Sequence, residues 1–256
     1  MTFNGPWGVQ DRRPGPLHPP SHVLGYCAAL ALTAGFVNAV ALLILAVPVG
    51  NLTGVTTQLG MDAANPWRYE SHVLIAILLG FLAGATVAGA LITSTQAPRS
   101  GRHATVLVME AVLLLLAAAG VEAPPVQAQL SSLGVEGTAV QALLAAAALG
   151  LQNGLTSSFR GMSVRTTHFT GTVTDLGLML GRSRQLGVDR WKVAILAMTL
   201  LAFLGGGVIG ILAAAHLGGY ALLVPVAICM SLAGVNLAQG RSQVVSIVAA
   251  AVPGAP

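Results

Sequence analysis

Three ionisable side chains in this sequence stand where they could do chemistry. Glu110 lies near the centre of an apolar run, while His168 and Asp175 flank a Thr-Gly pair. An acid inside a membrane span costs on the order of 2.5–3.5 kcal/mol on insertion scales, so Glu110 needs a partner or a role. We expect all three to act in proton or ion coupling, since histidine also titrates near neutral pH. Plainer interpretations stay open: a neutral packing acid for Glu110, an Arg-paired acid for Asp175, and a backbone-bonded loop residue for His168.

A second set of polar residues belongs to a motif that occurs twice. The string NLTGVTTQLG begins at Asn51, and HFTGTVTDLG begins about 117 residues later at His168. An apolar run ending in G-x-x-N precedes each copy, and a Phe-Leu-x-Gly string follows each one. Chance matches near helix ends are the rival explanation, but the matches keep their order along the chain. We therefore infer a duplicated unit, and such repeats with polar, Gly-interrupted segments are typical of transporter binding sites.

The residue types in the repeated motif suit a binding site at helix N-termini. Asn and Thr accept hydrogen bonds from free backbone N–H groups at helix starts. If two short helices aim their N-termini at one spot, their partial positive charges suit an anion or a carboxylate. Two amphipathic helices at the membrane surface, and amides that only join helices, are the alternatives. The expected substrate-binding residues are Asn38, Asn51, Thr53, Gly54, Gln152, Asn153, Thr167, Thr170, Gly171 and Thr174.

Composition places these residues in a bilayer. Hydrophobic residues make up 55% of the chain and charged residues 8%, with a mean hydropathy of +0.79, whereas soluble domains carry roughly 25% charged residues. A helix needs about 20 apolar residues to cross a membrane. Six runs have about this length: Val23–Val47, Val73–Thr93, Ala104–Gly120, Thr138–Leu155, Trp191–His216 and Tyr220–Leu237. The sequence thus predicts an all-α membrane protein with six transmembrane helices.

The basic residues predict the orientation. With a cytoplasmic N-terminus, every Lys and Arg except Arg68 falls on the cytoplasmic side. This positive-inside bias predicts a multi-pass membrane protein with both termini in the cytoplasm. The same bias explains the pI near 9.7 without a nucleic-acid partner, because the chain lacks a basic soluble domain.

Three spans per unit is an odd number, so the two units should be inverted relative to each other. In each unit we expect an extended segment, ending at Asn51 or at Phe169, that leads into a short half-helix. The expected half-helices are Gly54–Ala64 and Gly171–Gly181. The expected organisation is a disordered cytoplasmic tail 1–22, a first repeat 23–120, an external loop 121–137, a second repeat 138–237 and a cytoplasmic tail 238–256.

Motif searching argues against an enzyme. The chain has no Ser-His-Asp set and no H-E-x-x-H, C-x-x-C or phosphate-binding loop string. Its two cysteines, Cys27 and Cys229, lie inside predicted spans, so we expect no disulfide, no metal site and no cofactor. The favoured function is a permease for an unknown small solute or ion with a site between the repeats. The alternative is a non-transporting membrane scaffold or sensor, and the sequence leaves homo-oligomer formation open.

The strings GFVNA, NLTG, ALGLQNG and TTHFTGTVTDLG, together with a Glu in the third span, resemble the YoaK-type family of bacterial inner-membrane proteins. The resemblance runs from about Gly25 to Leu237 and departs from the family pattern at His168, where a small apolar residue is more usual. It implies a membrane protein whose motif residues include Asn38, Gly150 and Asn153. It supplies no substrate, because the family has no settled activity.

Overall fold

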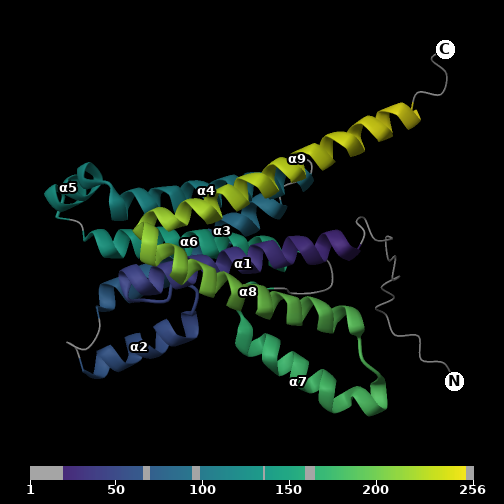
Figure 1. Ribbon diagram of the computed structural model, residues 1–256, viewed down its shortest axis with the longest axis horizontal. Helices are drawn as coiled ribbons and strands as arrows, with labels where there is room; N and C mark the ends of the chain where they lie inside the picture. Colours follow the sequence, from purple (N-terminus) through teal and green to yellow (C-terminus); the bar gives the residue numbers. More distant parts are fainter. Residues whose placement is uncertain (1–19, 66–69, 94–98, 135, 159–164, 252–256) are drawn as a thin grey trace, which may run out of the picture.

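The chain forms an elongated helical bundle in the computed structural model, which describes residues 20–65, 70–93, 99–134, 136–158 and 165–251 (Figure 1). Every regular element in these ranges is a helix. The elements are α1 Pro20–Leu45, α2 Leu52–Ala64, α3 Ser71–Thr93, α4 Arg99–Glu122, α5 Pro124–Ser132, α6 Gly137–Ser157, α7 Phe169–Leu186, α8 Arg190–Leu217, the 3₁₀ helix η1 Gly218–Leu222 and α9 Leu223–Ala251.

Five stretches of the described chain are long and apolar enough to cross a membrane. The fifth, Arg190–Gly240, has 51 residues and would measure about 77 Å as one straight helix, more than twice the ~30 Å of a bilayer core. It is not straight, because η1 separates α8 from α9 and Gly218 has a φ of 56°. Figure 1 shows α8 and α9 running back from this turn as two arms. The two arms correspond to the last two apolar runs expected from sequence.

Glycines bring α1 and α8 into direct backbone contact. A Cβ atom added to Gly35 would lie 2.0 Å from the carbonyl oxygen of Phe203, and one added to Gly206 would lie 2.0 Å from that of Leu32. Real Cβ atoms do not come this close, so only glycine permits the crossing. Gly35 and Gly206 therefore form the contact face between α1 and α8.

The crossing of α3 and α6 uses the corresponding residues. A Cβ atom on Gly150 would lie 2.2 Å from the carbonyl oxygen of Phe81, and one on Gly84 would lie 2.0 Å from that of Ala147. Gly150 corresponds to Gly35 in the repeated sequence, and Phe81 corresponds to Phe203. The two crossings are therefore built from matched positions of the two halves.

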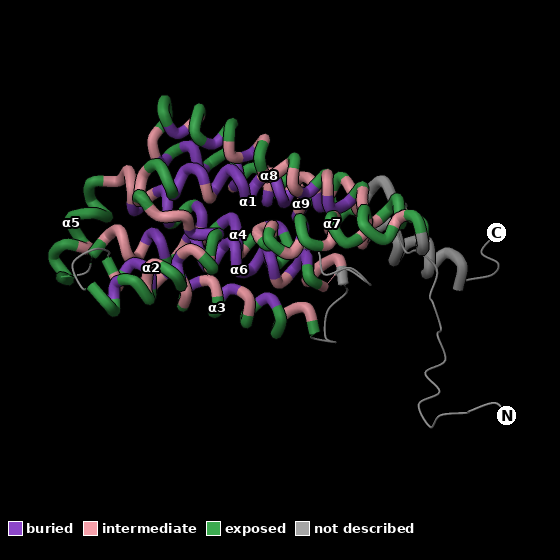
Figure 2. The backbone as a smooth tube through the Cα atoms, turned by 90° about the horizontal axis from the view of Figure 1, so that it is seen from below, coloured by how far each residue is buried: buried purple, intermediate pink, exposed green. Residues whose placement is uncertain are grey.

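The core lies among α1, α3, α4 and α6, with α9 packed along α4. Its largest fully buried side chains include Phe36, Leu107, Leu149 and Ile195. Figure 2 shows buried backbone concentrated in the central helices, whereas α2, α5 and α7 are mostly exposed. Within α2 only Val55 and Asp62 are buried.

The segments before α2 and α7 are turns rather than the extended segments expected. The Asn51 N–H lies 3.5 Å from the Pro48 carbonyl oxygen, and the His168 N–H lies 3.5 Å from that of Arg165. Ala46, with a φ of 58°, takes the chain out of α1. The β-branched residues misled the prediction because a local backbone hydrogen bond overrides β propensity in a loop. Residues 162–164 of the second expected extended segment lie outside the described part.

Other boundaries also differ from expectation. The half-helices are longer than expected and begin at Leu52 and Phe169. The expected external loop contains α5, which starts with two prolines that suit a helix N-terminus. The expected C-terminal tail is helical as far as Ala251, since its alanine-rich sequence has high helix propensity. Residues 1–19 of the expected N-terminal tail are not described.

Candidate functional site

The turns before α2 and α7 meet near the middle of the bundle. A Cβ atom on Gly50 would lie 3.3 Å from Cγ2 of Thr167 and 3.1 Å from Cδ1 of Leu149. Figure 1 shows α2 and α7 on one flank of the bundle, running in opposite directions from ends that face each other. The two helix N-termini predicted from the repeated motif therefore lie close together.

Two matched asparagines hold these turns. Oδ1 of Asn38 on α1 accepts a 2.8 Å hydrogen bond from the Gly50 N–H. Oδ1 of Asn153 on α6 accepts a 3.3 Å bond from the Thr167 hydroxyl, and its Nδ2 donates to the Leu149 carbonyl at 2.8 Å. Each asparagine sits at the end of a G-x-x-N string and reaches the turn that precedes the half-helix of its own repeat. Both asparagines therefore hold the two turns that meet at Gly50 and Thr167.

The starts of the two half-helices differ in capping. Oδ1 of Asn51 accepts a 3.1 Å hydrogen bond from the Gly54 N–H, so α2 has a side-chain cap. His168 holds the same position before α7, but its side chain makes no capping bond, although the imidazole lies against Gly171. Neither Thr167 nor Thr170 caps α7, contrary to one sequence expectation. The first turn of α7 thus has no side-chain cap within the described chain.

The glycine of each Thr-Gly pair has a steric role. A Cβ atom on Gly54 would lie 2.6 Å from Nδ2 of Asn51, and one on Gly171 would collide with the ring of His168. In both helices the side chain before the helix folds over the third helical residue. A larger residue than glycine at this position would push that side chain aside.

Gln152 is a fully buried amide beside this junction. Its Nε2 donates to the Leu30 carbonyl and to the Thr166 hydroxyl, both at 2.7 Å, and so joins α6 to α1 and to the turn before α7. Its Oε1 makes no hydrogen bond within the described residues. A buried amide oxygen without a donor is unusual, so this atom is free to accept from a ligand.

Threonines of the motif line the open side of the junction. The Thr57 hydroxyl donates to the Thr53 carbonyl at 2.9 Å, and the Thr174 hydroxyl donates to the Thr170 carbonyl at 2.8 Å. All four residues are exposed. A shallow depression on α2 is lined by Thr53, Thr57, Leu52 and Thr56.

Two of the three expected coupling residues lie away from the junction. Glu110 is fully buried on α4. Asp175 pairs with Lys192 on α8 at 3.3 Å, and both side chains are about half exposed. The interpretation of Asp175 as a solvent-facing paired acid therefore holds, with Lys rather than Arg as its partner. His168 stays at the junction and is exposed.

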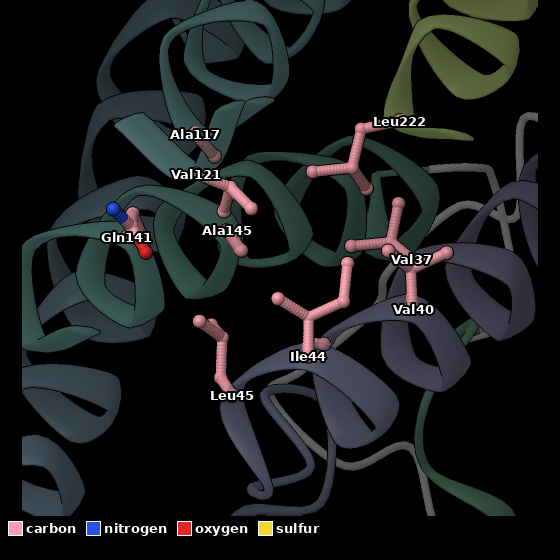
Figure 3. A pocket seen from close by; sticks show the side chains of 10 residues that line it. Val37, Val40, Ile44, Leu45, Ala117, Val121, Gln141, Ala145 and Leu222 are labelled. Atoms are coloured by element: carbon pink, nitrogen blue, oxygen red, sulfur yellow. The ribbon is translucent and has the colours of Figure 1, made fainter. Parts of the chain in front are cut away.

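A small closed cavity lies toward the α5 end of the bundle (Figure 3). It contains about 10 Å³ of water-accessible space, roughly one water molecule. Its walls are almost wholly apolar, from Val37, Ile44 and Ala145 among others, and Gln141 is their only amide. This space is too small for an organic solute.

Sequence reasoning missed several polar residues that the fold brings together. Thr166, which accepts from Gln152, and Gly50, which donates to Asn38, belong to no expected site. At the α5 end, Glu70, His72 and Glu136 bring one ligand atom each to within 4.8 Å of one another, and His72 forms an ion pair with Glu136. Carboxylate and imidazole groups bind divalent cations. The cluster could not be predicted from the sequence, because it joins the starts of α3 and α6, which are far apart in the chain.

Comparison with known proteins adds family membership. Residues 26–235 match the family described as "Protein of unknown function (DUF1275)". No curated protein and no solved structure matches the chain. The matched range includes both asparagines, both half-helices and Glu110, and it covers most of the 256 residues. The chain, which is helical and apolar in its described residues, belongs to the DUF1275 family.

Proposed function

We propose that this chain is a multi-pass permease of the bacterial inner membrane, with six spans arranged as two inverted repeats and both termini cytoplasmic. The observation that carries the proposal is the meeting of the α2 and α7 N-termini beside Gly50 and Thr167. Interrupted helices whose N-termini converge at mid-bundle form the substrate sites of many secondary transporters.

Reciprocal packing supports the inverted repeats. Gly35 of the first half packs on Phe203 of the second, and Gly150 of the second half packs on Phe81 of the first. An exchange of this kind is what a two-fold relation between the halves requires. Each tight helix pair, α1 with α8 and α3 with α6, therefore contains one helix from each repeat.

The hydrogen-bonding groups left open favour a small polar solute that carries a carboxylate or a similar anion. The first turn of α7 offers backbone N–H groups and a positive dipole end without a side-chain cap. Oε1 of Gln152 offers an acceptor to a donor group of the same solute. A solute with both an anionic and a donor group matches this pair.

Transport requires a second conformation, because the described cavity admits only about one water molecule. The glycine-locked pairs are suited to move as rigid bodies, since their backbones touch. Rocking of α1–α8 against α3–α6 would open the junction to each side of the membrane in turn. Glu110 on α4 is the proposed proton or ion coupling site.

The test is flux of labelled small carboxylates into liposomes that contain purified protein, with and without a pH gradient. Gln152→Met keeps the side-chain volume and removes the amide, so we expect solute affinity to fall by about tenfold or more. Gln141→Met is the matched control, because Gln141 lies on the same helix but away from the junction. The flux through this variant should equal that through the wild-type protein.

Two outcomes would contradict the proposal. Equal flux from Gln152→Met and Gln141→Met would remove the junction from the substrate path. Absence of flux from the folded wild-type protein across a panel of carboxylates, amines and ions would favour the scaffold or sensor alternative. Glu110→Gln should abolish any pH dependence of flux, and a variant with unchanged pH dependence would show that Glu110 is a packing residue.

A further inference from the structure

Glu110 belongs to a cluster of four titratable side chains in an otherwise apolar interior. The carboxyl group of Glu110 makes no hydrogen bond of good geometry within the described chain. The thiol of Cys229 on α9 lies beside it, and Tyr26 on α1 is close enough to interact with it electrostatically. The fourth is Cys27 next to Tyr26, and both thiols are buried and free. The remaining neighbours, such as Leu107 and Leu151, are apolar.

The cluster continues toward one end of the bundle through Asn236. Nδ2 of Asn236 on α9 donates a 3.4 Å hydrogen bond to the Tyr26 hydroxyl oxygen. Tyr26 and Asn236 are half-buried, whereas Glu110 and Cys229 are fully buried. One helical turn beyond Asn236, Gly240 packs against Ser100 at the start of α4. Asn236 and Tyr26 therefore lie between Glu110 and the end where α1 and α4 begin, which the basic residues assign to the cytoplasm.

We propose that Glu110 is a protonation site reached from the cytoplasmic end through Tyr26 and Asn236. A buried carboxylate without a cationic partner is costly, so a proton entering the cluster neutralises a charge that the protein does not otherwise compensate. The titratable groups next to Glu110 are Tyr26 from α1 and Cys229 from α9. Cys27 lies beside Tyr26, and His103 is two turns nearer the cytoplasm on α4 itself.

The proton transfer can be balanced atom by atom. The transfer takes place in a conformation that brings the Tyr26 hydroxyl within hydrogen-bond reach of Glu110. Water at the cytoplasmic end gives a proton to the Tyr26 hydroxyl oxygen as the hydroxyl gives its own proton to one Glu110 oxygen. Tyr26 ends neutral, the water becomes hydroxide in the bulk, and the charge on Glu110 changes from −1 to 0. A hydroxyl group can do this because it both donates and accepts. Asn236 holds the Tyr26 oxygen in place and acts as a positioning residue.

This inference deepens the proposed function, which uses Glu110 for coupling, but its test needs no solute. Infrared difference spectra of wild type minus Glu110→Gln, recorded in lipid nanodiscs, isolate the carbonyl band of the protonated Glu110 carboxyl. Transfer into D₂O then gives the rate of hydrogen exchange at this one group. We expect Tyr26→Phe and Asn236→Leu to slow the exchange by about tenfold or more. Tyr220→Phe is the matched control, since Tyr220 is at the opposite end in η1, and its exchange should equal wild type.

The side of entry is tested with the native thiol. Cys229 is the only thiol in a Cys27→Ala variant, and a small water-soluble thiol reagent should modify it faster from the cytoplasmic face of membrane vesicles than from the other face. Unchanged exchange in Tyr26→Phe, or faster modification from the external face, would overturn the route. Flux with a pH dependence that needs Glu110 but not Tyr26 would also reject the route while the permease proposal stands. Slowed exchange in Tyr26→Phe without any flux would sustain the route and reject the permease.

Discussion

The two half-helix junctions of this protein are built from matching residues, yet only the first is closed by its own side chains. Asn51 caps α2, and Asn38 satisfies the backbone N–H of Gly50. In the second half, His168 makes no capping bond, Oδ1 of Asn153 accepts from the Thr167 hydroxyl rather than from a backbone N–H of the turn, and Gln152 keeps an unbonded oxygen. A duplicated scaffold has thus kept its geometry while its hydrogen-bonding capacity has become unequal. We infer that the first junction is mainly structural and the second is where a ligand binds.

Replacing the glycines at the two helix crossings should destabilise the protein by a similar amount in both halves. Gly35→Ala and Gly150→Ala each place a Cβ atom within about 2.2 Å of a carbonyl oxygen, so each should cost at least 1–3 kcal/mol, roughly the range for overpacking. Thermal unfolding in detergent measures the loss. The matched control is Gly25→Ala on α1, which has open space around it and should be neutral or stabilising. A large loss in one half alone would break the reciprocal packing that supports the inverted repeats.

Substitutions of the two asparagines should affect stability and solute flux differently. Asn38→Ala leaves the buried Gly50 N–H without its acceptor, which should cost about 1–3 kcal/mol of stability. Asn153→Ala should cost less, because the half-buried Thr167 hydroxyl can rotate to another partner, but it should lower flux more. Paired measurements of unfolding and liposome flux give both quantities. Equal stability losses with equal flux losses would contradict the functional asymmetry.

The capping positions give the smallest expected effect. Asn51→Ala removes a cap and should destabilise the protein by roughly 0.5–2 kcal/mol, whereas His168→Ala removes no capping bond and should be near neutral. Hydrogen exchange of the amides in the first turns of α2 and α7 reports this locally. If His168→Ala destabilised α7 as much as Asn51→Ala destabilises α2, the second junction would be closed as well, and its role as the ligand side would be lost.

Much of the junction could be predicted from the sequence. A repeated Thr-Gly motif after a repeated G-x-x-N string predicted that Asn38 and Asn153 lie near one another, since matched positions of inverted units would converge. Capping was predictable for Asn51 from its residue type and position. The same prediction of a side-chain cap failed for α7, because the chain turns before His168 and neither Thr167 nor Thr170 takes the capping position.

The rest depends on long-range packing that a single sequence does not encode locally. Tyr26 and Asn236 are 210 residues apart, and neither stands in a motif. The neighbourhood of Glu110 also required the register of α4 against α9, which is set by contacts such as Gly240 on Ser100. The pairing of Asp175 with Lys192 on α8 could not be predicted either, because the spacing along α7 fixes the position of Asp175 but not the direction of its side chain.

Disulfide formation between the two turns tests the central claim most directly. In a variant without Cys27 and Cys229, Gly50→Cys and Thr167→Cys should form a disulfide on mild oxidation, because the position of a Cβ atom on Gly50 is 3.3 Å from Thr167 Cγ2 and disulfides need Cβ atoms about 3.5–4.5 Å apart. Cysteines at Gly60 and Gly177, further along half-helices that run in opposite directions, should stay reduced as a control. Mass spectrometry of the intact, folded protein reads the result. A disulfide in the first pair alone is the outcome that converging half-helices predict. A folded protein in which Gly50→Cys and Thr167→Cys stay reduced would contradict the site between the repeats.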